Sequence, residues 1–215
     1  MKKKLIGGII AGIVISGTLL LGLMSLTKIP AGYVGVQYNM NGGVRDEILS
    51  QGFHFVNPMV SVTKYSISSE TMALTKDSRE GSEGDDSFKV SCKDGEIQVS
   101  FEMQYAFKES EVTNVFQRYK GLDGNKIINE RLRTMIKSIT NEVLSNYTVT
   151  EAYLDKKAEV NKDLTDTLRD RLNEYGVYVE SATLSDTDVA ENVKQAIQNR
   201  MVKSQEVETA QLEKE

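Results

Sequence analysis

The chain has 215 residues, with 26 Lys or Arg against 31 Asp or Glu, so its formal net charge is −5. Hydrophobic residues make up 40% and charged residues 27%, which is typical of a globular protein and not of a disordered one. The acidic balance argues against a nucleic-acid binder, which presents a basic face. One cysteine, Cys92, excludes an internal disulfide and a multi-cysteine metal site, and one histidine, His54, argues against a His-based metal site.

The N-terminal segment is strongly apolar. Three lysines precede 23 uncharged residues, 5–27, a stretch that would be about 35 Å long as a helix at ~1.5 Å per residue. A hydrocarbon core is about 30 Å thick, so we expect a single transmembrane helix within an anchor of residues 1–28. The alternative is a cleaved signal peptide. Its apolar core is shorter and ends in a small-x-small site, which residues 23–26 do not provide.

The charges around this segment predict its orientation. Lysines stand at positions 2–4 before the segment, and Lys28 stands shortly after it. Positively charged flanks stay in the cytoplasm, so the N-terminus is expected to be cytoplasmic and the body extracytoplasmic, at the cell membrane. The short Lys-, Ile- and Asn-rich sequence and the compact anchor point to a bacterial or phage-encoded protein.

The first half of the body has the period-two pattern of strands. Val34 and Val36 alternate with polar or small residues before a turn at 41–43, which predicts a hairpin. Short strands are expected around 53–55 and 60–67, separated by a turn at Asn57-Pro58. Residues 77–87 are acidic and rich in Gly, and indicate a loop. Two strands, 88–92 and 97–107, follow around a turn at Asp94-Gly95.

The second half changes to helical periodicity. Helices are expected over 112–119 and 128–143. A third helix opens at a capping box, Thr148-x-x-Glu151, and ends at Gly176. A last strand is expected over 177–184, and a charged helix from Asp188. This tail is interpreted as the start of a coiled coil, against the alternative of a solvated charged helix.

Several blocks in this order resemble the SPFH family, also called band 7 (stomatin, prohibitin, flotillin and the bacterial regulators of membrane-bound AAA proteases). The blocks are IPAGYVGV at 29–36, QGFHFVNP at 51–58, CKDG at 92–95, YGVYV at 175–179 and the Glu-, Gln- and Lys-rich tail. The resemblance implies an α+β fold in three parts: the anchor 1–28, an SPFH domain of antiparallel strands plus helices at 29–187, and a C-terminal helix at 188–215. Three features depart from the family pattern: Lys156-Lys157 where a basic residue, often Arg, is usual, a long acidic insertion at 78–86, and a tail shorter than that of the prohibitin branch.

The residues that could carry chemistry do not form a recognisable catalytic, cofactor-binding or metal site. His54, between Phe53 and Phe55, is expected to point outward or to make a structural hydrogen bond, and Cys92 is expected in the core. The acidic cluster at 77–86 (Asp77, Glu80, Glu83, Asp85 and Asp86) lacks the ligand spacing of a calcium loop, so we expect a solvated loop. Asn146-Tyr147-Thr148 is only a formal glycosylation acceptor. No enzyme activity and no cofactor are predicted.

The expected function is therefore assembly. The resemblance implies a membrane scaffold that self-associates into large rings or cages around a patch of bilayer, and it allows a sister SPFH subunit and a membrane-bound AAA protease as partners. Two alternatives stay open at this stage. One is an extracytoplasmic ligand-binding or sensor module that acts as a monomer or dimer, and the other is an unrecognised hydrolase or metal-dependent enzyme.

Overall fold

The computed structural model describes residues 26–77 and 84–188, together with positions 194, 195, 198, 199, 202, 203 and 206, which have helical backbone. The predicted membrane helix, most of the acidic insertion and the predicted C-terminal helix as a whole lie outside the described residues. The chain divides into two compact units. Unit 1 comprises residues 26–69 with Ala106–Ile127, and unit 2 comprises Glu70–Tyr105 with residues from Ile128 onward.

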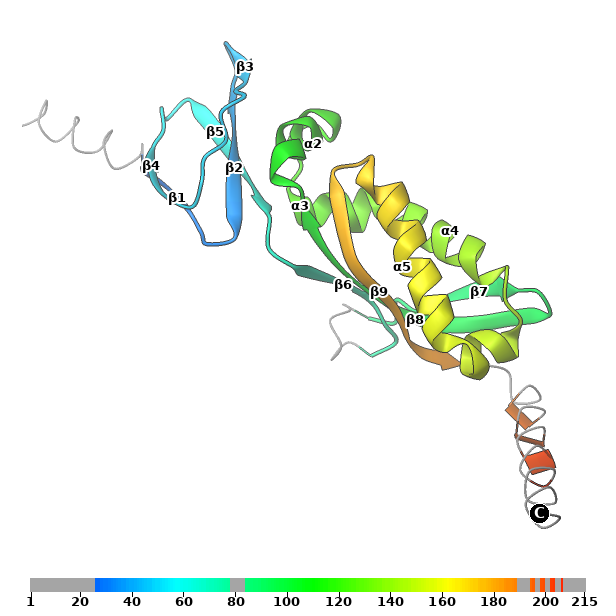
Figure 1. Cartoon of the computed structure of the whole chain (residues 1–215). Helices are drawn as coiled ribbons and strands as arrows, with labels where there is room; N and C mark the ends of the chain where they lie inside the picture. The colour runs from blue at the N-terminus through cyan, green and yellow to red at the C-terminus, as the bar shows by residue number, and fades with distance from the viewer. Residues whose placement is uncertain are drawn as a thin grey trace, which may run out of the picture. The chain divides into compact units, whose positions relative to one another are not determined.

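Unit 1 contains five strands in two small antiparallel sheets (Figure 1). Strand β1 (Leu26–Ile29) pairs with β4 (Gly52–Phe55). The second sheet has the order β3-β2-β5, built from β2 (Tyr33–Asn39), β3 (Gly43–Val44) and β5 (Val60–Ser66). The predicted hairpin at 41–43 is confirmed as the β2–β3 turn, where Gly43 has a φ of 76° that favours glycine.

Strand β1 begins inside the segment expected to be a membrane helix. Leu26 and Thr27, the last two residues of the apolar run, pair with Phe55 and His54 of β4. Strand pairing satisfies the backbone groups of these residues, so a helix that includes them is wrong for this part of the chain. The remaining uncharged run, 5–25, is still about 30 Å long as a helix.

The helical part of unit 1 covers one face of its larger sheet. It contains the short turn η2 (Glu109–Glu111), α2 (Val112–Arg118) and α3 (Gly124–Lys126). The Tyr65 hydroxyl of β5 donates to the Leu122 carbonyl at 2.7 Å, and the Tyr38 ring of β2 lies 5.9 Å from that of Phe116. On the opposite face, a Cβ added at Gly35 would meet Ile29 Cδ1 at 2.9 Å, so β1 packs closely there.

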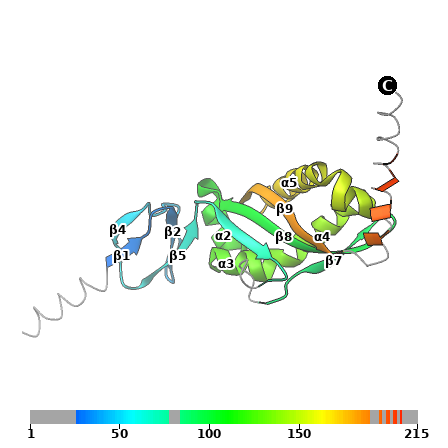
Figure 2. The same cartoon turned by 90° about the horizontal axis from the view of Figure 1, so that it is seen from below.

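Unit 2 has a longer antiparallel sheet (Figure 2). Strand β8 (Gly95–Phe107) pairs with β6 (Glu70–Leu74), with β7 (Phe88–Cys92) and with β9 (Val177–Asp188). The predicted hairpin between β7 and β8 is confirmed, with Cys92 opposite Gly95. Strand β6 was not expected, because its five residues ETMAL carry too few alternations to stand out.

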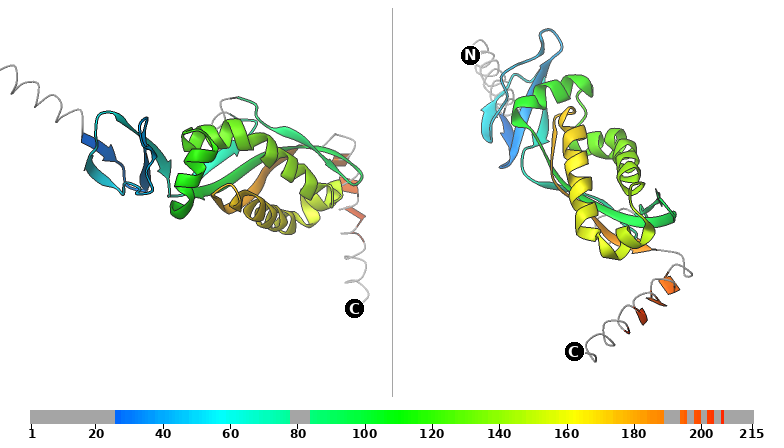
Figure 3. Two further views of the ribbon diagram at one scale, coloured as in Figure 1. Left: turned by 90° about the horizontal axis from the view of Figure 1, so that it is seen from above. Right: turned by 45° about the vertical axis from the view of Figure 1, so that its right-hand side comes forward.

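Helices of unit 2 supply the other half of its core. They are the π-helical turn η3 (Ile127–Leu132), α4 (Arg133–Leu144), the π-helical turn η4 (Glu151–Asp155) and α5 (Lys157–Asn173). Figure 3 shows α4 and α5 running side by side. The apolar stripe of α5 follows the helical period in the sequence, and its members Val160, Leu164, Leu168 and Leu172 are fully buried, whereas Tyr175 just beyond the helix is half-buried. Gly176 has a φ of 75°, which confirms the predicted helix end.

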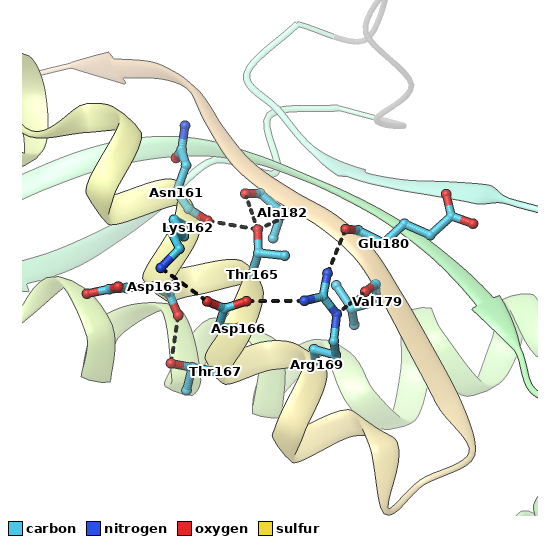
Figure 4. A network of polar contacts seen from close by, with 10 residues as sticks. All are labelled: Asn161, Lys162, Asp163, Thr165, Asp166, Thr167, Arg169, Val179, Glu180 and Ala182. Carbon is cyan, nitrogen blue, oxygen red and sulfur yellow. Dashed lines mark hydrogen bonds and ion pairs between the residues drawn. The ribbon is translucent and has the colours of Figure 1, made fainter.

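Polar side chains of α5 are bonded to the backbone of β9 (Figure 4). Arg169 donates through Nε to the Val179 carbonyl at 2.9 Å and through Nη2 to the Glu180 carbonyl at 3.0 Å. Thr165 exchanges hydrogen bonds with Ala182, donating at 3.1 Å and accepting at 2.9 Å. Along β9 the next buried residue after Val179 is Ala182, where strict alternation would bury Ser181. The alternation therefore shifts by one residue where Arg169 binds.

The fold is therefore α+β with antiparallel strands, as predicted. Within the described residues, no helix is long and apolar enough to cross a membrane.

Candidate membrane-facing surface

The β1–β4 pair presents an apolar face to solvent. Leu26 lies directly opposite Phe55, and Lys28 lies opposite Phe53. Residues that are paired across strands, or two apart on one strand, share a face, so these four side chains point the same way. The exposed fraction is 42% for Leu26, 67% for Phe53 and 82% for Phe55. We call Leu26, Phe53 and Phe55 the apolar face.

A cation lies next to this face. Lys28 Nζ is 5.8 Å from the ring centroid of Phe53, within range of a cation–π contact. Lysine can place its methylene stem on apolar surface while its ammonium reaches water or a phosphate. Aromatic rings beside such a cation are the combination that favours the boundary between acyl chains and headgroups.

The opposite face of the pair is anchored to the body. Ile29 is 2% exposed and approaches Gly35 of β2. His54 Nε2 hydrogen-bonds the Ser50 carbonyl at 2.7 Å, so the expected structural hydrogen bond is present. The phenylalanines around His54 are more exposed than the histidine itself. The apolar face is thus held on a supported strand pair.

A turn just after β4 adds another exposed apolar side chain. Asn57 Oδ1 accepts from the Met59 amide at 2.9 Å, and the Asn57 carbonyl accepts from the Val60 amide at 2.8 Å. This geometry confirms the turn predicted at Asn57-Pro58. Met59 is 76% exposed, four residues beyond Phe55.

Exposure on this scale is costly in water. Fully burying a phenylalanine side chain stabilises by about 1.5–3 kcal/mol, so the pair Phe53 and Phe55 can contribute roughly 2–4 kcal/mol if an apolar phase covers it. Neighbouring exposed rings on one strand face differ from scattered single hydrophobic residues, and such patches mark contacts with proteins or membranes.

The other residues considered from sequence lie elsewhere. Cys92 ends β7 beside a turn and is partly exposed, so its expected place in the core is wrong. Burial, and then the charge of Asp94, raises the pKa of the Cys92 thiol to about 11. Asn146 follows α4 and donates through Nδ2 to the Glu142 carbonyl at 3.3 Å.

The described part of the acidic cluster is engaged in local contacts. Asp86 forms an ion pair with Arg133 of α4, and Asp85 Oδ1 accepts from the Ser87 amide at 3.2 Å. Glu80 and Glu83 lie outside the described residues. In ranges 26–77 and 84–188, no three His, Cys, Asp or Glu side chains come together as metal ligands.

Sequence reasoning predicted the strand at Phe53 and Phe55 but not the exposure of its aromatic face. The segment GFHFV has apolar residues in both phases, Phe53 and Phe55 in one and Val56 in the other. Val56 is 6% exposed, so the side of the strand that carries Val56 is buried and the side that carries the two phenylalanines is exposed. The local pattern therefore leaves open which phase is buried.

A protein-family model matches most of the chain. The family model described as SPFH domain / Band 7 family matches residues 27–215, and a search of curated proteins found no match. The matched range includes all the strands of unit 1 from Thr27 onward and the whole described part of unit 2. The chain therefore belongs to the SPFH / Band 7 family.

Proposed function

We propose that this protein is a membrane-anchored, non-enzymatic scaffold that self-assembles into large ring- or cage-like oligomers. In this proposal the assembly organises a patch of membrane, restrains a membrane partner such as an AAA protease, or does both. Family membership supports a membrane-associated scaffold in general terms. The observation that carries the membrane part is the exposed apolar face, whose Leu26 directly follows the uncharged run 5–25 in sequence and pairs with Phe55.

The proposal places the apolar face at the bilayer boundary. In this proposal the uncharged run 5–25 forms the membrane helix, and β1 begins directly after it in sequence, so the face would lie where the chain leaves the membrane. Phe53 and Phe55 then enter the upper acyl region, while the Lys28 ammonium pairs with lipid phosphates. Two points of attachment, the helix and this face, restrict how unit 1 can tilt on the membrane. A restricted tilt favours side-by-side assembly, because fewer orientations are lost on association.

Assembly itself rests on family membership and on general physical grounds. Weak contacts repeated around a closed ring gain avidity, so each contact can be modest. An alternative, a ligand-binding or sensor module that acts as a monomer or dimer, predicts a small particle instead.

The chain lacks tryptophan, so a single substitution supplies a unique fluorescent probe. Full-length Phe55→Trp in vesicles that contain brominated phosphatidylcholine is expected to show blue-shifted emission and strong quenching. Tyr38→Trp is the matched control, because Tyr38 belongs to the same unit but contacts Phe116 on the opposite face of the β2–β5 pair. Equal and weak quenching of the two variants would contradict the membrane-facing role.

The assembly is tested by particle mass. The full-length protein, extracted in mild detergent, is examined by native electrophoresis and electron microscopy. A closed particle of many copies supports the scaffold, whereas monomers or dimers across several detergents would favour the binding-module alternative.

A further inference from the structure

Unit 1 contains a pocket that the membrane role does not use. Its volume is about 500 Å³, within the range of sites that hold small organic ligands. It lies between β2, β3 and β5 on one side and α2 with its following turn on the other. Its walls include Tyr38, Val44, Ser61, Thr63, Phe116 and Lys120.

The pocket and the apolar face lie on opposite sides of the β2–β5 pair. Tyr38 pairs with Ser61 and Val36 pairs with Thr63, so Tyr38, Ser61 and Thr63 share the face that α2 covers. Gly35, which points the other way, approaches Ile29 of β1. A ligand would therefore enter the pocket from the side of the β2–β5 pair opposite the apolar face.

Two rings form the apolar wall of the pocket. The ring centroids of Tyr38 and Phe116 are 5.9 Å apart with an interplanar angle of 32°, and Val44 lines the pocket beside them. This wall suits an aromatic or branched aliphatic group, because apolar burial and ring contacts both stabilise such a group.

The polar lining of the pocket includes several hydrogen-bond donors. Ser61 Oγ donates to the Tyr38 carbonyl at 3.4 Å and Thr63 Oγ1 donates to the Gly121 carbonyl at 3.5 Å, so their protons are already used. The Tyr38 hydroxyl, the Gln117 amide and the Lys120 ammonium are free of hydrogen bonds and ion pairs to the described part of the chain. The lining contains one cation and no carboxylate.

Lys120 is held in an unusual conformation at the edge of the pocket. Its φ is 55°, in the left-handed region that lysine rarely adopts, and Gly121 follows at 75°. A non-glycine residue in this region is strained, and strained backbone is concentrated at binding sites.

We propose that this pocket binds a small organic carboxylate that carries an aromatic or branched aliphatic body. The body packs against Tyr38, Phe116 and Val44, and the carboxylate accepts from Lys120, Gln117 and the Tyr38 hydroxyl. This inference is independent of the proposed scaffold function, because neither the anchor nor the apolar face takes part in it.

The test uses the full-length protein in lipid nanodiscs and 3-(4-fluorophenyl)propanoate as the probe, observed by fluorine NMR line broadening. Protein-free nanodiscs correct for partition of the probe into lipid. Lys120→Gln is expected to raise the Kd about tenfold, since a hydrogen bond to a charged group contributes about 1.5 kcal/mol or more. The neutral amide of the probe should bind the wild-type protein with a Kd about tenfold higher than that of the carboxylate. Lys64→Gln, on the same strand as Ser61 and Thr63 but outside the pocket, should leave the Kd unchanged.

A second variant tests the location. Ser61→Tyr places a good strand former at an exposed strand position and fills the pocket, so it should abolish binding while the unfolding transition is unchanged. Broadening no greater than in protein-free nanodiscs would overturn the proposal. Equal affinity for acid and amide, or equal effects of Lys120→Gln and Lys64→Gln, would overturn it as well.

Discussion

Thr148 and Glu151 hydrogen-bond each other's backbone amides. The Thr148 amide donates to Glu151 Oε2 at 3.0 Å, and the Glu151 amide donates to Thr148 Oγ1 at 3.3 Å. Lys156 Nζ lies 3.0 Å from Glu151 Oε1. The Thr148 amide first, and then Lys156, lower the pKa of Glu151 from 4.5 to about 2.

This pair predicts a pH dependence of stability. The folded-state pKa of Glu151 is depressed, so its stabilisation is fully present above about pH 4.5 and is lost as the pH falls toward 2. Urea unfolding between pH 5 and pH 2.5 should show a smaller loss of stability for Glu151→Gln than for the wild type. Lys156→Met removes the ammonium that also lowers the pKa of Glu151, so its loss of stability between pH 5 and pH 2.5 should lie between those of the wild type and Glu151→Gln. A Glu151→Gln curve parallel to the wild type would contradict the assignment.

Replacing Arg169 is expected to destabilise unit 2. Arg169→Lys loses the two-pronged contact with the Val179 and Glu180 carbonyls, which a lysine cannot reproduce. We expect a loss of about 1–3 kcal/mol in the free energy of unfolding. Arg171→Lys is the matched control: its pair with Glu142 is largely exposed and should contribute less than about 0.5 kcal/mol. Equal midpoints of denaturant unfolding for the two variants would show that the bonds of Arg169 to β9 do not stabilise unit 2.

We expect the two exposed rings of the apolar face, Phe53 and Phe55, to contribute little to the stability of the fold. Phe53→Ser combined with Phe55→Ser should change the free energy of unfolding by no more than about 0.5 kcal/mol in mild detergent, because the rings bury little surface within the chain. Phe101→Ser is the control, since Phe101 is 0% exposed and its loss should cost more than about 3 kcal/mol. A comparable cost for the double variant would place Phe53 and Phe55 in the folding core.

The Cys92 thiol is expected to react slowly with alkylating reagents, although the residue is partly exposed. Its raised pKa leaves little thiolate at pH 8, and the thiolate is the reactive form. Alkylation by iodoacetamide should be at least about tenfold slower in the folded chain than in urea, and the folded rate should keep rising up to pH 10. The chain has no other cysteine, so the readout is unambiguous. A folded rate that levels off near pH 9 would contradict the raised pKa.

The left-handed conformation of Lys120 predicts that glycine is better tolerated than alanine. Lys120→Gly should be more stable than Lys120→Ala by about 1 kcal/mol, because both remove the same side chain but glycine alone adopts a φ of 55° without strain. Thermal unfolding of the two full-length variants checks this difference. If alanine is as stable as glycine, the conformation is not strained.

Local features of this protein were predictable from sequence. The β7–β8 hairpin, the capping box at Thr148 and the helix end at Gly176 depend on residues within a few positions of one another. The alternation of β8 and the stripe of α5 were equally clear, because each repeats long enough to exceed chance.

What tertiary structure decided depends on contacts between distant residues. Leu26 and Thr27 became strand residues because Phe55 and His54 were available as partners. The exposure of Phe53 and Phe55 followed from the choice of Val56 for burial, which the local pattern leaves open. Arg169 looks like any charged helix residue until β9 brings its carbonyls within 3.0 Å. The sequence by itself thus determined the local hairpins, the helix ends and the elements with long repeats. The pairing of distant strands, the exposed face of β4 and the pocket of unit 1 required the packed chain, because burial is a property of the whole fold and not of a segment.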